Sequence, residues 1–386
     1  MSIQGRVAAG FESVADAFAR AFDGRPTMGA ALAIRHKGEE VVSLWGGTAD
    51  ERAQAAWGES TASVIFSCTK GLVSILAARL VEEGRLDYAA PVARYWPEFA
   101  AGGKDRITVG DVLAHRAGLS APADAWSFDD LLDWSVPTSR LARQSPLWSP
   151  GSGYAYHAIT HGWLAGEIIR RVAGQSVGTC FAEAVTAPLD VPAWIGLPSG
   201  FEGQVAHLQL APTLENFWDA EAARDAVAPN WPYRAMTLGG ALPPTLVTSS
   251  GAFNDRRLQS AEIPGAGGIA TASALASIWS ATVTPTAGVQ LLQPGTVALA
   301  TRAASAGPPV FDAPPPYARW GMGFQLDSEA RRYLTATSFG HDGAGGQSAF
   351  ADPEHAIGFA FITNWLEAGN DDRATAIIDA LRQILG

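Results

Sequence analysis

The sequence predicts an α/β protein in which strands from both chain ends form one sheet and a mostly helical region is inserted between them. Two sets of strand-like apolar runs support this prediction, one near residues 30–45 and one between residues 320 and 363. The long stretch between them shows helical periodicity instead. With 386 residues, the chain can bury a large core and form two or three structural units.

The strands are expected at both ends of the chain. Residues 30–34 and 41–45 flank the turn signal Lys37-Gly38 and predict a hairpin within residues 27–46. Near the C-terminus we expect four short strands, at residues 320–325, 336–339, 347–351 and 357–363, with a turn at residues 352–355 before the last one. A final helix beginning at Asp371 or Asp372 would place its apolar residues on one face.

Helical patterns dominate the middle of the chain. Residues 72–83 form an apolar pattern that ends at Gly84, and residues 109–115 form a shorter one that ends near Gly118. Further helices are expected at residues 159–172 and at residues 272–281, the latter capped by Thr271. The sequence therefore predicts strands near both chain ends and helices in the middle of the chain.

Composition narrows the classes of function. Hydrophobic residues make up 47% of the chain and the formal net charge is −11, with no basic run. This balance predicts a compact protein whose partners are neither nucleic acid nor an anionic membrane, because both would repel its surface. Two cysteines cannot form a disulfide framework, and no secretory leader or run of about 18 apolar residues is visible. The expected location is the cytoplasm.

Ser67 and Lys70 are the candidate catalytic pair. They lie three residues apart at the start of an apolar helical pattern, so they would face the same side of a helix. Backbone N–H groups at a helix N-terminus can stabilise an oxyanion, and a lysine in an apolar setting can have the lowered pKa that proton transfer requires. The chain has only three lysines, and Lys70 alone has a serine three positions before it.

The surroundings of this pair resemble the serine β-lactamase-related superfamily. The resemblance spans most of the chain from about residue 25 and rests on ordered blocks: residues 66–71 (FSCTKG), 80–87 (LVEEGRLD), 91–99 (PVARYWPEF), 107–119 (ITVGDVLAHRAGL), 150–156 (PGSGYAY), 267–271 (GGIAT) and 340–346 (GHDGAGG). The superfamily includes class C β-lactamases, D,D-peptidases and family VIII carboxylesterases, and the last of these is the group that this chain resembles most.

The resemblance implies a β-lactamase/transpeptidase-like fold. In this fold an α/β sandwich with a central antiparallel sheet, built from both chain ends, stands beside a mostly helical inserted domain. The expected boundaries are residues 1–62 and 263–386 for the α/β domain and residues 63–262 for the helical domain. The helix that carries the nucleophile would then lie at the interface.

The resemblance also implies roles for individual residues. Ser67 corresponds to the acylated nucleophile, and Tyr156 to the second proton handler. Either Tyr156 as phenolate or Lys70 as amine could accept the serine proton, and the sequence leaves both open. His341-Asp342-Gly343 stands where many relatives have Lys-Thr-Gly. The N–H of Ala344 is expected to join that of Ser67 in an oxyanion hole.

Two departures from the family pattern favour an uncharged ester as substrate. His341 replaces a permanently charged lysine that holds substrate carboxylates, and Ala158 replaces an asparagine that holds acylamino groups. His341 is expected to contact the substrate or the Lys–Tyr pair. Gly343, being small, would let the substrate approach closely. Trp126, Trp148 and Trp218 are expected to wall an apolar pocket.

The predicted function is a carboxylesterase that acts on a small-molecule ester through a Ser67 acyl-enzyme. It needs no cofactor, and no metal site is predicted, because no carboxylate or cysteine accompanies His157 and His161 at ligand spacing. Cys68 is expected to be a buried neighbour of the nucleophile. The alternatives are a β-lactamase, a D,D-peptidase or D-aminopeptidase-type hydrolase, an acyltransferase on the same site, or a non-catalytic binding homologue. The sequence carries no signal for an oligomeric state.

Overall fold

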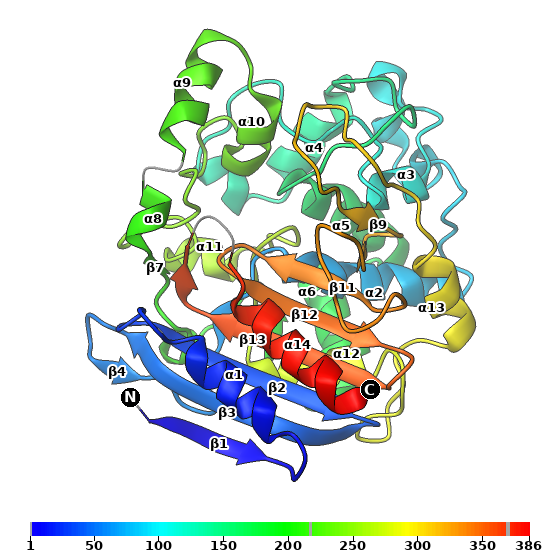
Figure 1. Cartoon of the computed structure of the whole chain (residues 1–386). Coiled ribbons are helices and arrows are strands. Elements are labelled where there is room, and N and C mark those ends of the chain that lie inside the picture. The colour runs from blue at the N-terminus through cyan, green and yellow to red at the C-terminus, as the bar shows by residue number, and fades with distance from the viewer. Residues whose placement is uncertain (1, 216–217, 368–370) are drawn as a thin grey trace.

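The computed structural model describes residues 2–215, 218–367 and 371–386. Within these residues, nine strands form one antiparallel sheet, and most helices lie to one side of it (Figure 1). The strand order is β1-β3-β2-β13-β12-β11-β10-β9, and β4 pairs with β3. The strands are β1 (Ile3–Val7), β2 (Gly29–His36), β3 (Glu39–Asp50), β4 (Ala55–Ala56), β9 (Arg319–Trp320), β10 (Gln325–Leu326), β11 (Phe339–Gly343), β12 (Gln347–Asp352) and β13 (Ile357–Thr363).

The two chain ends meet in the middle of this sheet. β2 pairs antiparallel with β13, from His36 opposite Ile357 to Ala30 opposite Thr363. The predicted N-terminal hairpin is confirmed, and its turn residues Lys37 and Gly38 have φ values of 54° and 87°. The prediction of one sheet built from both ends is therefore confirmed.

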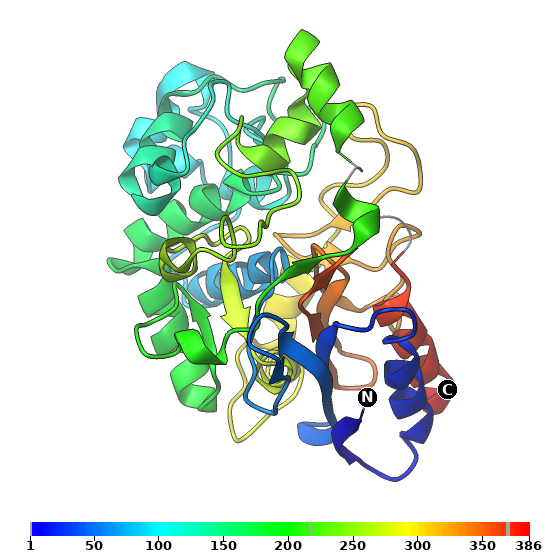
Figure 2. The same ribbon diagram turned by 90° about the vertical axis from the view of Figure 1, so that its left-hand side faces the viewer.

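Helices cover both faces of the sheet. On one face, α1 (Glu12–Arg20) and α14 (Arg373–Leu385) lie side by side, as Figure 2 shows. Apolar side chains from both helices, among them Phe18 and Ile377, form a buried cluster with Phe361 of β13. On the other face, α12 (Ala272–Ser280) packs so closely on β13 that a Cβ at Gly358 would lie 2.2 Å from the carbonyl oxygen of Ala276.

The remaining helices belong to the inserted region and its connections. They are α2 (Cys68–Glu82), α3 (Val109–Leu113), α4 (Ser135–Arg143), α5 (Thr160–Ala173), α6 (Val177–Phe181), α7 (Ala187–Leu189), α8 (Pro212–Glu215), α9 (Asp219–Val227), α10 (Trp231–Thr237), α11 (Arg256–Ser260) and α13 (Pro294–Ala300). Each of the four internal helices expected from the sequence has a counterpart, namely α2, α3, α5 and α12. Thr271 caps α12 by accepting a hydrogen bond from the N–H of Ala274.

Some expectations about strands are corrected by the structure. Residues 320–325 form parts of two strands, because Gly321 and Gly323 make a tight turn that places Gln325 opposite Trp320. The strand expected at residues 336–339 lies further along, at Phe339–Gly343. β1 and α1 were not predicted.

Short separate sheets lie outside the main one. β5 (Ser63–Val64), β8 (Gly268–Ala270) and β6 (Ala193–Ile195) form one of them, and β14 (Trp365–Leu366) pairs in parallel with β7 (Gln209–Leu210). The N–H of Ile65 donates to the carbonyl of Gly268, so the chain is tethered two residues before Ser67. In the part of the chain that the structure describes, no helix has the length and apolarity needed to cross a bilayer.

Candidate active site

The local backbone at the start of α2 positions Ser67. Ser67 is the N-cap residue, and Phe66 before it adopts a left-handed conformation with φ of 43°. Such a φ costs free energy in a non-glycine residue and persists only where packing enforces it. Phe66 is fully buried, and its ring packs edge-on against Phe253 with 5.3 Å between centroids. Buried packing thus holds the sharp turn that presents the Ser67 hydroxyl.

The structure brings Ser67, Lys70 and Tyr156 together. The side-chain nitrogen of Lys70 lies 2.9 Å from Ser67 Oγ, and the Tyr156 hydroxyl donates to the same oxygen at 2.8 Å. Lys70 also donates to the main-chain oxygens of Ala158 at 2.5 Å and Gly265 at 2.6 Å. One serine oxygen therefore contacts both an amine and a phenol.

Burial sets the proton affinities of this group. Lys70 is fully buried, and desolvation lowers its pKa well below its usual value, although two carbonyl acceptors favour the charged form. Desolvation raises the pKa of Tyr156, and the hydrogen bond to Ser67 only partly offsets this effect. The lysine is thus shifted toward its neutral amine and the tyrosine toward its neutral phenol.

The residues of the third motif lie on β11, beside the segment that precedes Ser67. A Cβ at Gly343 would lie 2.4 Å from the carbonyl oxygen of Ile65, so only glycine allows the strand to come this close. Ala344 follows directly and is partly buried against the same core. The backbone after β11 is therefore held near the start of α2.

His341 is buried and uncharged. Its Nδ1 donates to the carbonyl oxygen of Asp342 at 2.6 Å, and its buried Nε2 has no hydrogen-bond partner among the described residues. Burial, together with the charge of Lys70, lowers the pKa of His341 to about 3. Its ring lies 6.1 Å from the Tyr156 ring between centroids, and no described hydrogen bond joins it to Lys70 or Tyr156. His341, the first residue of the third motif, therefore supplies no positive charge.

The neighbouring Asp342 and Cys68 have structural partners. Asp342 pairs with Arg331 at 2.8 Å, an interaction that the sequence did not reveal. Cys68 is buried, its thiol donates to the carbonyl oxygen of His341 at 3.1 Å, and burial raises its pKa. A thiol with a raised pKa is a poor nucleophile, so Cys68 is no rival to Ser67.

Rings on the far side of Tyr156 hold it in place. Trp320 of β9 stacks on it with 5.2 Å between centroids and an interplanar angle of 17°. His115 packs edge-on at 5.0 Å, and His161 lies 4.8 Å behind His115. Burial lowers the pKa of both histidines. The described residues contain no cluster of three or more histidine, cysteine or acidic side chains placed to hold a metal ion.

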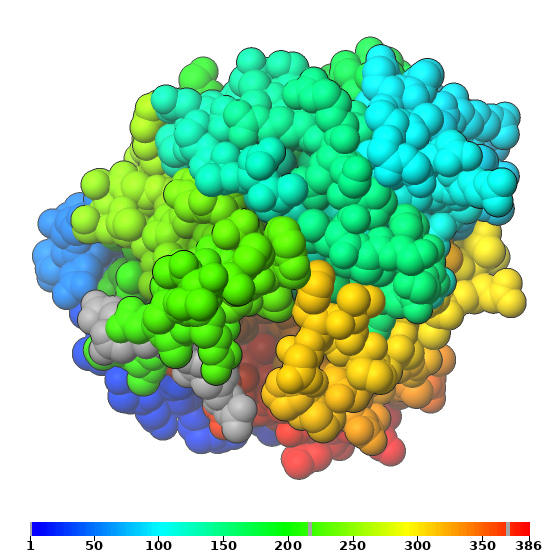
Figure 3. All heavy atoms as spheres, turned by 90° about the horizontal axis from the view of Figure 1, so that it is seen from above, coloured from blue at the N-terminus to red at the C-terminus, as the bar shows by residue number. Residues whose placement is uncertain are grey.

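A cavity of about 390 Å³ opens beside Tyr156. Its walls come from α10, from the loop at residues 309–318 and from β9, and Trp218, Met236, Phe311, Tyr317 and Trp320 are among its lining residues. Viewed from above, the surface is hollowed between the green segment that contains α9 and α10 and the golden loop that precedes β9 (Figure 3). The sequence did not reveal that this loop lines the cavity beside Tyr156, because its placement depends on the tertiary fold.

Of the three tryptophans expected in the pocket, Trp218 lines this cavity and the others do not. Trp126 packs against Trp163 at 5.7 Å in the core of the helical region. Trp148 packs edge-on against His157 and against Phe311, so it supports the cavity wall from behind. These two indoles pack between elements and do not line this cavity, and their expected role in substrate binding stays a prediction.

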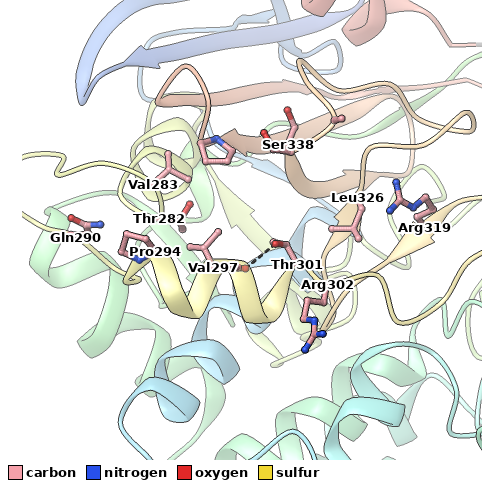
Figure 4. A pocket seen from close by; sticks show the side chains of 14 residues that line it. Thr282, Val283, Gln290, Pro294, Val297, Thr301, Arg302, Arg319, Leu326 and Ser338 are labelled. Atoms are coloured by element: carbon pink, nitrogen blue, oxygen red, sulfur yellow. Dashed lines mark hydrogen bonds between the residues drawn. The ribbon is translucent and has the colours of Figure 1, made fainter.

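Another cavity, of about 480 Å³, lies on the other side of β9 (Figure 4). It is bordered by Val297 and Thr301 at α13 and by Leu326 and Arg319 of the β9–β10 hairpin. Neither Ser67, Lys70 nor Tyr156 lines it. Of these three residues, Tyr156 lines the smaller cavity.

The antiparallel sheet, the inserted helices and a serine at the start of a buried helix define a serine hydrolase of the β-lactamase and transpeptidase fold. Residues 15–382 match the protein family described as Beta-lactamase, and the chain belongs to that family. It is 34% identical over 366 residues to "Esterase/beta-lactamase LipL" of Mycobacterium tuberculosis (strain ATCC 25618 / H37Rv), an alignment that covers 92% of this chain and 81% of the relative.

Solved structures show the same fold. A family VIII carboxylesterase superposes with a TM-score of 0.87 at 32% identity, and each chain is covered completely. A penicillin-binding protein homologue from Caulobacter crescentus gives the same TM-score at 35% identity, again with complete coverage of both chains. These similarities establish the fold and the hydrolase class of this chain.

Proposed function

We propose that this protein is a carboxylesterase that cleaves uncharged carboxylic esters through an acyl-enzyme on Ser67. The observation that carries the proposal is the convergence of Lys70 at 2.9 Å and Tyr156 at 2.8 Å on the oxygen of Ser67. An oxygen held in this way can lose its proton as it attacks a carbonyl carbon.

The directions of the pKa shifts favour Lys70 as the base. Because burial lowers the pKa of Lys70 and raises that of Tyr156, a neutral amine is more accessible than a phenolate. Lys70 takes the proton as Ser67 Oγ bonds to the carbonyl carbon. The N–H groups of Ser67 and Ala344 are proposed to bind the oxyanion.

Collapse of the tetrahedral intermediate completes acylation. The bond from carbon to the alcohol oxygen breaks, and the leaving oxygen takes the hydroxyl proton of Tyr156, which leaves a phenolate beside the Lys70 ammonium. Water then attacks the acyl carbon while this pair accepts its proton. Ser67 leaves with a proton, and the carboxylic acid is released.

An uncharged ester fits this site better than a β-lactam does. β-Lactams and peptide C-termini carry a carboxylate, and the position of the third motif holds only neutral, buried His341. Two similar proteins have esterase or carboxylesterase in their names, which is consistent with this choice. The ester is therefore the proposed substrate, and β-lactam hydrolysis on the same serine is the alternative outcome.

Intact-mass spectrometry of the protein with a panel of short esters and β-lactams tests the proposal. We expect a mass increase equal to the acyl group with esters, faster turnover of esters than of a chromogenic cephalosporin, and no adduct in Ser67→Ala. Ser74→Ala is the matched control, because Ser74 lies on the same helix and donates only to the carbonyl of Lys70. Faster cephalosporin turnover, or an adduct that persists in Ser67→Ala, would contradict the proposal.

A further inference from the structure

The donors around Ser67 indicate on which side the alcohol leaves. Once Lys70 has taken the serine proton, its nitrogen carries three hydrogens, and three oxygens already surround it, namely Ser67 Oγ and the carbonyls of Ala158 and Gly265. Tyr156 is then the group that can give a proton to the leaving oxygen. The alcohol part of the ester must therefore sit next to the Tyr156 hydroxyl.

The cavity of about 390 Å³ lies on this side of the nucleophile. Tyr156 lines it, whereas Ser67, Gly343 and Ala344 do not. The proposed oxyanion hole is thus outside the cavity, and the phenol that protonates the leaving group is at its wall. When the carbonyl carbon of the ester faces Ser67, the part of the substrate that fills the cavity is therefore the alcohol.

The lining of this cavity combines aromatic rings with one carboxylate. Trp218, Phe311, Tyr317 and Trp320 contribute ring faces or edges, and Asp312 contributes the carboxylate. Asp312 is exposed and forms no ion pair with any residue that the structure describes. Among the described lining residues there is no lysine or arginine.

The nearest arginine on β9 faces away from the cavity. Arg319 and Trp320 are consecutive residues of this strand, so their side chains point to opposite sides. Trp320 lines the cavity beside Tyr156, whereas Arg319 borders the larger cavity shown in Figure 4. The strand thus separates an acidic, aromatic cavity from one that carries positive charge.

We propose that the cavity beside Tyr156 is the alcohol subsite and that it selects esters of alcohols bearing an alkylammonium group. Aromatic rings attract such cations through their π faces, and Asp312 adds a complementary charge at the rim. The net charge of −11 further attracts cationic and repels anionic substrates. This inference rests on the proposed ester hydrolysis and adds the class of alcohol.

A pair of isosteric esters tests the inference. Choline butyrate and 3,3-dimethylbutyl butyrate share the acyl group and differ by the charge of one central atom. The ratio of kcat/KM for choline butyrate to kcat/KM for 3,3-dimethylbutyl butyrate is measured in the wild type and in Asp312→Asn. Comparing the two ratios cancels the different intrinsic reactivity of the two esters. We expect this ratio to fall about fivefold in Asp312→Asn, while kcat/KM for the neutral ester stays within about twofold.

Two further variants separate local from general effects. Asp124→Asn removes the same charge from an exposed site that borders a different cavity, and it should leave the ratio unchanged. Tyr317→Leu keeps apolar volume but removes a ring, and it should lower the ratio. Equal ratios in the wild type and Asp312→Asn, or an equal fall in Asp124→Asn, would overturn the inference while ester hydrolysis still stands. If the protein hydrolysed neither ester but did hydrolyse a cephalosporin, the proposed function itself would be refuted.

Discussion

Tyr156 contacts Ser67 through its hydroxyl, while its ring is held by Trp320 and His115. Tyr156→Phe removes the proton donor and keeps the ring. We expect kcat/KM for a neutral ester to fall by about 10²–10⁴, because general acid catalysis of the leaving group is lost. The melting temperature should change little, since the ring stays packed against the core and only one hydroxyl is removed.

Tyr154→Phe is the matched control for this variant. Tyr154 lines the same cavity, but its hydroxyl donates to the carbonyl of Gly307 at 2.7 Å and not to Ser67. It should lose far less activity than Tyr156→Phe. Similar losses in both variants would mean that Tyr156 acts through the shape of the cavity.

The pH dependence of kcat/KM follows from the same residues. The pKa of Lys70 is lowered from an ordinary value near 10.4, so the reactive amine forms as pH rises through this lowered pKa. The pKa of Tyr156 is raised above about 10, so its proton remains available until higher pH. We expect kcat/KM to rise with pH at values well below pH 10 and then to stay constant up to about pH 10. Activity that rises only above pH 10 would contradict a neutral Lys70 as base.

At the scale of elements, the contact between α12 and β13 depends on Gly358. A Cβ there would lie 2.2 Å from the oxygen of Ala276 and 2.4 Å from the nitrogen of Ser280. Gly358→Ala therefore forces the helix away from the sheet and should cost about 1–3 kcal/mol in the free energy of unfolding, measured with urea. Gly295→Ala in α13 is the control, because no atom lies within 4 Å of its Cβ position, and it should not destabilise the protein. Equal stability of the two variants would contradict this packing argument.

Elements with short-range signals were predictable from the sequence. The turn at Lys37-Gly38, the strand at Ile357–Thr363 and the cap at Thr271 each depend on a few neighbouring residues, and the structure has them at those places. The prediction of a single strand at residues 320–325 was wrong, because it counted the glycines of a tight turn as strand positions. β1 is largely exposed and lacks an apolar pattern, so its sequence gave no signal.

For the candidate site, residues close together on one helix could be predicted to lie side by side. Contacts between segments that are far apart in the sequence could not be predicted. Ser67 and Lys70 are three residues apart on one helix, and the family pattern added Tyr156. The cavity walls come from α10 and the 309–318 loop, and the sequence does not reveal that these segments meet. The partly buried pair of Arg331 and Asp342 was likewise not evident from the sequence. The division into domains at residues 62 and 263 remains a prediction.

At the scale of the whole molecule, the site is coupled to both chain ends through the sheet. β11 carries His341 and Gly343 and pairs with β12, which pairs with β13, which pairs with β2. The cluster between the sheet and helices α1 and α14 supports these strands from the face opposite α12. We therefore expect a loss of packing in this cluster to weaken the position of β11 beside the candidate site.

Phe18→Ala tests this coupling. Phe18 is fully buried on α1 and packs edge-on against Phe361 of β13, with 6.3 Å between ring centroids. Removing the ring should cost about 3–5 kcal/mol, a large part of the 5–15 kcal/mol typical of a folded domain. We expect the urea midpoints for loss of esterase activity and for loss of far-UV circular dichroism to fall together. Leu299→Ala, at a position 42% exposed on α13, should leave both midpoints nearly unchanged. If Phe18→Ala shifted the circular dichroism transition alone, the two ends of the chain would not be needed for the geometry around Ser67.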